Sequence, residues 1–193
     1  FDPNDPLLLY IAEEHRIRRV TTYSDDPGEH VLGLPTTGGG HFTRTIAFGP
    51  ASAEPARLPA GQAGPAGGAT AGKPDCKLYI SVGSSCNVCI EESERRAAIL
   101  SYDVGSGKTE LFARGLRNAV FFTWHPVTGK LWATEMGRDE LGDDLPPDEI
   151  NVVEAGGNYG WPRIEGSPTL PGMQPPITFY TPAIAPSGAS FYR

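Results

Sequence analysis

Two stretches of this chain repeat one another, and the repeat limits the folds available to it. Residues 45–50 (TIAFGP) match residues 121–126 (FFTWHP), and residues 77–81 (KLYIS) match residues 130–134 (KLWAT). The first pair lies 76 residues apart and the second pair 53. Residues 51–75, which are dominated by Ala, Gly and Pro, account for the difference. Because such a stretch buries too little apolar surface to repay its ordering, we predict a flexible insertion loop there.

Short runs rich in β-branched and aromatic residues predict strands throughout the chain. With 24 Gly and 19 Pro, the chain interrupts helix interiors too often for a helical bundle. Residues 91–98 could form one helical turn at most. The predicted strands span residues 7–12, 16–23, 29–34, 43–48, 77–82, 98–104, 109–113, 119–124 and 130–134.

A repeat of roughly 40–50 residues with four strands per unit is typical of a β-propeller. The chain then holds three strands of one blade, a complete blade, an elaborated blade and, at residues 188–192, the opening strand of another. Closed propellers have at least about four blades. We therefore expect residues 1–193 to be a partial propeller, an internal fragment of a longer protein, since Phe1 is neither an initiator Met nor followed by a leader. The alternative is a small β-sandwich.

Charge and hydropathy exclude two classes of function. The net charge is −7 and the isoelectric point is near 5.1, so the chain lacks the basic face that nucleic acids require. The longest apolar runs have about five residues, whereas a membrane-spanning helix needs about 20. We expect neither nucleic-acid binding nor a transmembrane segment.

Two short segments before predicted strands carry candidate functional side chains. Residues 38–44 (GGGHFTR) place His41 after three glycines, which let a backbone approach a ligand closely. Loops of this kind line the channel mouth of a propeller, where a neutral imidazole could act as a general base. At the equivalent place in the next repeat stand Arg117, which suits carboxylates, and Asn118, a mixed donor and acceptor. The alternatives are a structural His, a surface Arg and a turn Asn.

Residues 135–149 contain seven carboxylates in fifteen residues, interrupted by Gly and Pro. Hard cations such as Ca²⁺ prefer several oxygen ligands from flexible loops, although the spacing is not that of an EF-hand. The alternative is a solvated acidic loop. The following residues 155–162 (AGGNYGWP) predict a tight, packed turn that supports the site.

The cysteines leave two interpretations open. Cys86 and Cys89 form a C-x-x-C motif, and Cys76 stands apart. Ile90 follows the motif where c-type haem attachment needs His, and structural zinc needs a second pair of ligands. A local disulfide in an oxidising compartment or two free thiols remain.

As a set and in this order, the motifs resemble those of the soluble quinoprotein sugar dehydrogenases, the family of pyrroloquinoline quinone (PQQ)-dependent glucose, aldose-sugar and sorbosone dehydrogenases. The resemblance spans about residues 35–165. Residues 84–89 (SSCNVC) and 138–144 (RDELGDD) look most similar to the L-sorbosone dehydrogenase branch. The matching stretches are residues 40–50, 77–89, 115–118, 132–139 and 148–162.

The resemblance implies a six-bladed propeller with PQQ over the channel mouth, held partly by Ca²⁺. His41 falls on the family's catalytic base, which takes the proton of the anomeric hydroxyl while hydride passes to the quinone C5 carbon. Arg117 and Asn118 fall on PQQ contacts, with Arg117 also catalytic because it polarises the quinone oxygen. Gly137 and Arg138 fall on the residues whose backbone carbonyls bind the Ca²⁺, and the acidic loop would shape the site.

Four departures from the family pattern argue against glucose as the substrate. Ser84 replaces the acid that partners the base, and Gly40 replaces a sugar-contacting acid. Val120 replaces a PQQ-contacting Gln, and Met136 replaces a more polar residue. The family's further PQQ-binding Lys and Arg residues would follow Arg193, so we expect the isolated chain to bind PQQ weakly or not at all and to be inactive.

The resemblance thus implies a periplasmic or extracellular dehydrogenase that oxidises an aldose or sorbosone-like sugar. A small sugar would be the substrate, and a quinone, cytochrome or dye the external electron acceptor. Two other interpretations stay open. The acidic loop could supply a metal-dependent lactonase propeller, and Ser84 favours a propeller that binds without catalysis.

Overall fold

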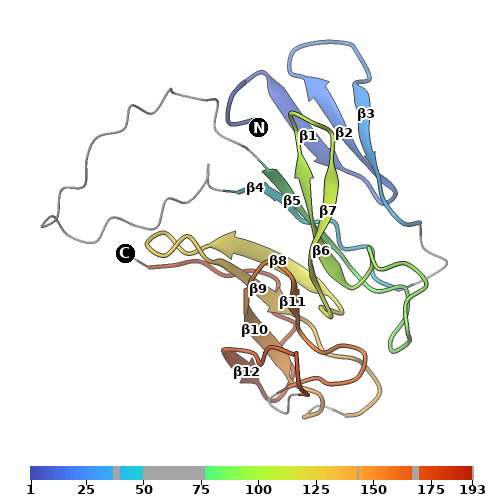
Figure 1. Ribbon diagram of the computed structural model, residues 1–193, viewed down its shortest axis with the longest axis vertical. Helices are drawn as coiled ribbons and strands as arrows, with labels where there is room; N and C mark the ends of the chain where they lie inside the picture. The colour runs from blue at the N-terminus through green and yellow to red at the C-terminus, as the bar shows by residue number, and fades with distance from the viewer. Residues whose placement is uncertain (37–39, 50–76, 143, 167–169, 193) are drawn as a thin grey trace, which may run out of the picture.

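The computed structural model describes residues 1–36, 40–49, 77–142, 144–166 and 170–192. Its regular structure is entirely β, arranged in three sheets that follow one another along the chain (Figure 1). The described residues therefore include no helix that is long and apolar enough to cross a membrane. The predicted insertion at 51–75 lies outside the described residues, as do Gly38, Gly39 and Cys76.

The first sheet has three antiparallel strands in the order β1-β2-β3, as expected for an incomplete blade. The second sheet is the antiparallel series β4-β5-β6-β7, with the short strand β11 added in parallel to β7. The third sheet has the antiparallel order β8-β9-β10-β12. The bounds are β1 Leu8–Ala12, β2 Arg16–Thr21, β3 Glu29–Gly33, β4 Ile46–Phe48, β5 Lys77–Val82, β6 Ala98–Asp103, β7 Thr109–Arg114, β8 Ala119–Trp124, β9 Leu131–Glu135, β10 Asp148–Val153, β11 Gly157–Asn158 and β12 Thr178–Tyr180.

The sequence repeat is a repeat of sheets. β4 and β8 begin the second and third sheets, and β5 and β9 pair with them as the second strands. The starts of β4 and β8 lie side by side, because the Thr45 hydroxyl donates a hydrogen bond to the Val120 carbonyl. The loops that precede these two strands therefore meet at one end of the sheets.

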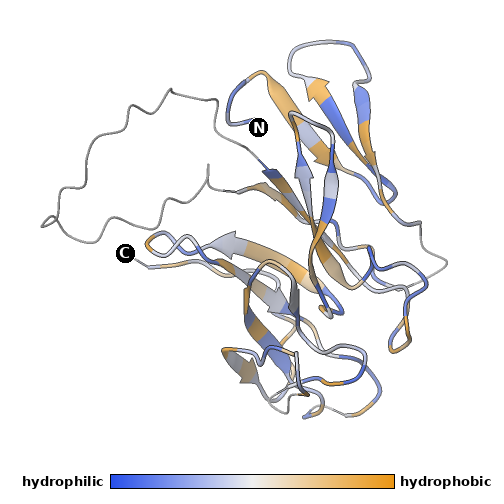
Figure 2. Cartoon of the chain, viewed as in Figure 1, coloured by the Kyte–Doolittle hydropathy of each residue, from blue (hydrophilic) through white to orange (hydrophobic). Residues whose placement is uncertain are grey.

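The central sheet is buried on both faces, which explains the nearly continuous apolar sequence of β6. Leu100 packs with Ile17 and Leu78 in a core toward the first sheet. Its neighbour Ile99 points the other way, as successive strand residues do, and packs with Phe122 in a core toward the third sheet. Hydrophobic residues accordingly recur along the strands of all three sheets (Figure 2).

The predicted opening strand at residues 188–192 is wrong for this chain. None of the described segments pairs with these residues, and a strand needs a partner for its backbone N–H and C=O groups. Phe191 instead packs on His125 and Trp132, with ring centroids 4.6 and 5.5 Å away. The end of the described chain thus covers the β8–β9 hairpin without extending a sheet.

Candidate active site

A pocket of about 340 Å³ brings together all five predicted site residues, which come from three separate loops. One loop precedes β4, one joins β7 to β8, and one follows β9. The pocket is lined by His41, Arg117, Asn118, Met136, Gly137, Arg138, Asp139, Glu140, Gly142, Leu145, Pro146, Asp148, Ala183 and Ala185.

His41 is half-buried, and its hydrogen bonds fix which ring nitrogen carries the proton. Nδ1 lies 2.8 Å from the Ser84 hydroxyl oxygen. That hydroxyl donates its single hydrogen to the Cys86 carbonyl, 2.7 Å away. It must therefore accept from Nδ1–H, so Nε2 keeps its lone pair. Ser84 thus orients the ring, at the position where the resemblance implies an acid in the glucose enzymes.

The surroundings of His41 favour its neutral form. Burial lowers the pKa of the imidazole below its ordinary value of 6.5, and the positive charge of Arg117 lowers it further. The interaction with Ser84 opposes this shift only partly. The ring is consequently neutral near pH 7, as a general base must be.

Two glycines allow the His41 loop to lie against the loop that follows β5. Gly40 has φ +96°, and a Cβ there would lie 2.4 Å from the backbone carbon of Ser85. A Cβ on Gly83 would lie 2.5 Å from the Cβ of His41. The glycine at position 40, a departure from the family pattern, is thus required by the close packing that positions the base.

Arg117 is 2% exposed, so the alternative of a surface arginine is wrong. Nε donates to the Asn87 carbonyl (2.9 Å), and Nη1 donates to the carbonyls of Met136 (3.1 Å) and Gly137 (2.7 Å). Nη2 donates to Asn87 Oδ1 (2.8 Å) and to Asp139 Oδ2 (3.0 Å). All five N–H groups are paired, yet the only carboxylate among the partners belongs to Asp139, whose side chain is 78% exposed.

Asn118 is fixed from its backbone and from its side chain. Its N–H donates to Glu135 Oε1 (2.8 Å), and its side-chain oxygen accepts from the Thr43 hydroxyl. Its side-chain nitrogen lies 3.7 Å from the sulfur of Met136. Asn118 therefore lies in a turn, as one alternative had it, and presents a rigid amide to the pocket.

Gly137 and Arg138, the predicted calcium ligands, are held by buried acids. The Gly137 N–H donates to Asp148 Oδ1 (2.9 Å), and Asp148 Oδ2 also accepts from Ile184 N–H (2.7 Å). The Arg138 N–H donates to Glu165 Oε1 (3.0 Å), and the two side chains form an ion pair at 3.2 Å. These contacts fix the backbone of both residues at the pocket wall.

The chemistry of this wall fits a hard cation bound together with an anionic ligand. Carbonyl oxygens are ligands that Ca²⁺ prefers, and the Gly137 oxygen keeps a second lone pair beside its bond to Arg117. A cation at that oxygen would lie close to the positive guanidinium. The site therefore suits a cation whose charge is balanced by carboxylates of the ligand, as in a Ca²⁺–PQQ pair.

The alternative of a fully solvated acidic loop is wrong for three members of residues 135–149. Glu135, Asp148 and Glu149 are at most 5% exposed. Burial raises the pKa of the Glu135 and Glu149 carboxyls, and Glu149 raises that of Glu135 further. Glu135, Glu149 and Glu165 surround a small cavity behind Gly137. Sequence patterns missed this cluster because charged residues are ordinarily exposed.

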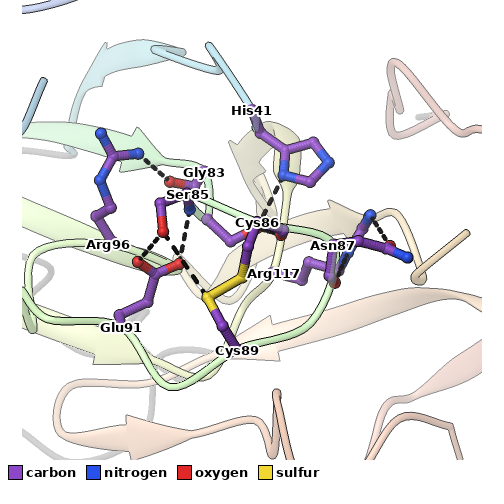
Figure 3. Close-up of a disulfide and its surroundings, with 10 residues drawn as sticks. His41, Gly83, Ser85, Cys86, Asn87, Cys89, Glu91, Arg96 and Arg117 are labelled. Atoms are coloured by element: carbon purple, nitrogen blue, oxygen red, sulfur yellow. Dashed lines mark hydrogen bonds between the residues drawn. A yellow bond between two sulfur atoms is a disulfide. The ribbon is translucent and has the colours of Figure 1, made fainter. Parts of the chain in front are cut away.

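The C-x-x-C motif forms a disulfide between Cys86 and Cys89, so the prediction of a local disulfide is confirmed and that of free thiols is wrong. Glu91 lies close to both sulfurs, but oxidised sulfurs are not thiolate ligands, and the motif is no metal site. The Glu91 carboxylate instead accepts hydrogen bonds from the backbone N–H and the hydroxyl of Ser85, each at 2.7 Å. Figure 3 shows Asn87 of this loop beside Arg117, with His41 above the same loop.

A second pocket, of about 370 Å³, lies between residues 90–97 and 158–163 and contains none of the predicted site residues. Tyr159 and Trp161 beside it are buried, and the Tyr159 hydroxyl donates to the Val152 carbonyl. The turn predicted at residues 155–162 is therefore packed as expected.

Comparison with known proteins agrees with the predicted resemblance. Residues 100–193 match the family described as Glucose / Sorbosone dehydrogenase. An uncharacterized protein of Borreliella burgdorferi is 36% identical over 129 residues, which cover 61% of this chain and 34% of that protein. The aldose sugar dehydrogenase YliI of Escherichia coli is 29% identical over 121 residues, or 55% of this chain and 28% of that enzyme.

The fold resembles that of the PQQ-bound aldose sugar dehydrogenase of Streptomyces coelicolor, with a TM-score of 0.61 and 20% identity. The match covers 93% of this chain and 51% of that one, so the chain spans about half of the structure it matches. The predicted β-propeller is thereby confirmed as the fold of which the three sheets form a part, and the β-sandwich alternative is wrong. Residues 100–193 are thus similar to the glucose/sorbosone dehydrogenase family, which agrees with the resemblance seen in the motifs.

Proposed function

We propose that the protein is a PQQ-dependent sugar dehydrogenase that oxidises an aldose or sorbosone-like sugar by hydride transfer to the quinone. The observation that carries the proposal is the pairing, in one pocket, of a neutral histidine that keeps a free Nε2 lone pair with a buried arginine. The family match and the printed names of the aldose sugar dehydrogenases support it.

Each pocket residue has a role that its contacts suit. His41 Nε2 takes the proton of the sugar hydroxyl, because Nδ1 is committed to Ser84. Arg117 and Asn118 bind the cofactor, and the positive guanidinium stabilises negative charge that develops beside it. The carbonyls of Gly137 and Arg138 hold Ca²⁺. PQQ, when bound, supplies the acceptor for the hydride.

Asp139 is the partner of Arg117 that a ligand can replace. The other acceptors of the guanidinium are backbone carbonyls and the Asn87 amide, which belong to packed loops. The Asp139 carboxylate is exposed at the pocket mouth, so it can leave at small cost. An anionic group of the cofactor would then take its place.

The proposed substrate rests on the residues that differ from the family pattern, and the proposed compartment rests on the disulfide. Gly40 and Ser84 remove two acids of the glucose enzymes, so we propose a sugar of the sorbosone type rather than glucose. The Cys86–Cys89 disulfide suits an oxidising compartment, and we propose a periplasmic or extracellular location. An external quinone, cytochrome or dye would accept the electrons.

The lactonase alternative has little support from the contacts. Asp148 is the buried carboxylate that lines the pocket, and both of its oxygens already accept backbone N–H groups. Asp139 is paired with Arg117. A metal for lactone hydrolysis would have to share these carboxylates with the groups that they already bind.

The proposal is tested by reconstituting the protein, expressed at full length, with PQQ and Ca²⁺. We expect dye reduction that depends on PQQ and on an aldose or sorbosone-like sugar, with glucose a poor substrate. A sample that binds PQQ but oxidises none of these sugars would refute the dehydrogenase. Lactone hydrolysis without PQQ would favour the lactonase, and neither activity would favour the non-catalytic propeller.

A further inference from the structure

We propose that the loop closed by the Cys86–Cys89 disulfide positions both the base and the arginine of the candidate active site, with Asn87 as its central positioning residue. The loop itself contributes no residue to the lining of the pocket. It contacts the two groups from behind. The catalytic consequence rests on the proposed function, whereas the structural consequence does not.

On the arginine side, Asn87 supplies two of the five acceptors of the guanidinium. The Asn87 carbonyl accepts from Arg117 Nε, and Asn87 Oδ1 accepts from Nη2. These two bonds fix the plane of the guanidinium, because they engage two edges of a rigid fork. Loss of the Asn87 side chain would leave one buried N–H of this cation without its acceptor, which is costly.

Asn87 also ties down the neighbouring loop. Its side-chain oxygen accepts from the Asp139 N–H at 2.8 Å, and its side-chain nitrogen donates to the Asp139 carbonyl at 3.2 Å. The Asn87 amide thus pairs with the Asp139 backbone as a strand residue would. Through this pair, the loop that follows β9, including Gly137, is held beside Arg117.

On the histidine side, the same loop acts through Ser84. The Cys86 carbonyl accepts the Ser84 hydroxyl hydrogen, which forces that oxygen to accept from His41 Nδ1–H. If Cys86 moved away, the hydroxyl could donate to Nδ1 instead. The proton would then reside on Nε2, where a general base needs a lone pair.

The disulfide replaces hydrophobic packing as the constraint on this loop. Val88 is 45% exposed and Ile90 is 82% exposed, so neither anchors the loop in a core. Residues 86–89 belong to no strand. A covalent closure over four residues restricts the conformations of Asn87 that would otherwise be accessible. Both cysteines are partly exposed, so a reductant can reach them.

The first test compares Asn87→Ala, Asn87→Asp and Val88→Ala in the full-length protein, loaded with PQQ and Ca²⁺. Asn87→Ala should lower kcat by roughly tenfold or more, with a smaller change in the KM of the sugar, since it removes the side-chain acceptor of a buried charged group and both side-chain bonds to the Asp139 backbone. Asn87→Asp keeps the acceptor for Arg117 and should recover part of the loss. Val88→Ala, in the same loop, should match the unaltered protein.

The second test uses a dithiol reductant on the same protein. Thiol–disulfide exchange breaks the Cys86–Cys89 bond and yields two thiols, while the two thiols of the reductant become a disulfide. Reduction should slow the unaltered protein about as much as Asn87→Ala does. The Cys86→Ser/Cys89→Ser double variant should begin slow and should not respond to the reductant.

Hydrogen exchange separates this inference from the proposed function. Backbone exchange of peptides covering residues 136–142 should accelerate at least roughly tenfold in Asn87→Ala and on reduction, but not in Val88→Ala. Unchanged exchange in both cases would overturn the positioning role whether or not the protein oxidises sugars. Faster exchange with undiminished turnover would overturn its catalytic consequence. Faster exchange in a protein that oxidises no sugar would support the positioning role of the disulfide loop and refute the proposed function.

Discussion

The Ser84 hydroxyl contacts His41 Nδ1 at the position where the family resemblance implies a carboxylate in the glucose enzymes. A carboxylate stabilises an imidazolium, whereas a hydroxyl only orients the ring. Together with burial and the charge of Arg117, this leaves the pKa of His41 below its ordinary value. His41 thus stays neutral because its partner is a hydroxyl, which does not stabilise the charged imidazolium as a carboxylate would.

A first prediction concerns the pH dependence of catalysis. The acid limb of kcat/KM should lie below pH 6.5, because activity falls only when His41 becomes protonated. In Ser84→Asp the new carboxylate should raise the pKa of His41 and move this limb to higher pH. The pH–rate profiles of the two proteins check this, and identical limbs would contradict the assigned base.

A second prediction concerns the exposed partner of Arg117. Asp139→Asn should tighten PQQ binding several-fold, because it removes an anion that competes for the guanidinium. Titration of the metal-loaded protein with PQQ measures the affinity. Glu140→Gln removes an equal charge from the same pocket rim without a bond to Arg117, and it serves as the control. Equal effects of the two variants would show that only net charge matters.

The sequence predicts site residues that belong to recognisable motifs, but not those whose role depends on contacts between distant loops. His41, Arg117 and Asn118 were found from motifs, and they do meet in one pocket. Asn87 and Glu165 were missed, although they hold Arg117 and Arg138. Their signal is absent from any local pattern, because it arises only when distant loops pack together.

The strands with regular apolar patterns were predicted from the sequence, whereas β10, which buries polar and charged residues, was not. The hairpins β4–β5, β6–β7 and β8–β9 follow the predicted runs closely. The sequence pattern did not predict β10, because its buried residues include Asp148, Glu149 and Asn151. These side chains are tolerated inside because they accept or donate hydrogen bonds locally.

A third prediction concerns the loop before β4. Gly40→Ala should lower the free energy of unfolding by roughly several kcal/mol. Alanine disfavours the positive φ of this position, and its Cβ would clash with the Ser85 backbone. Gly156→Ala has a similar φ of +76° but open space around it, and it should cost only about 1 kcal/mol. Chemical unfolding of both variants measures the difference. Equal losses would show that the clash is relieved.

At the scale of the whole molecule, the three sheets form part of a propeller fold. The chain spans about half of the structure it resembles. The pocket carries Arg117 and Arg138 but also Asp139, Glu140 and Asp148. The two positive charges are thus opposed by three carboxylates on the same wall.

A fourth prediction follows for the chain of 193 residues expressed alone. It should bind PQQ at least about tenfold more weakly than the full-length protein, since we propose that further cationic contacts to PQQ lie outside these 193 residues. Equilibrium titration in the presence of Ca²⁺ compares the two. Equal affinity would mean that the described residues suffice for the cofactor.

The most direct measurement of the central claim is sugar-dependent dye reduction by the full-length protein with PQQ and Ca²⁺, unaltered and as His41→Ala. The account predicts turnover that requires PQQ and that falls by roughly 100-fold or more in the variant, while both proteins bind PQQ comparably. Near-normal turnover by His41→Ala, with PQQ bound, would contradict it.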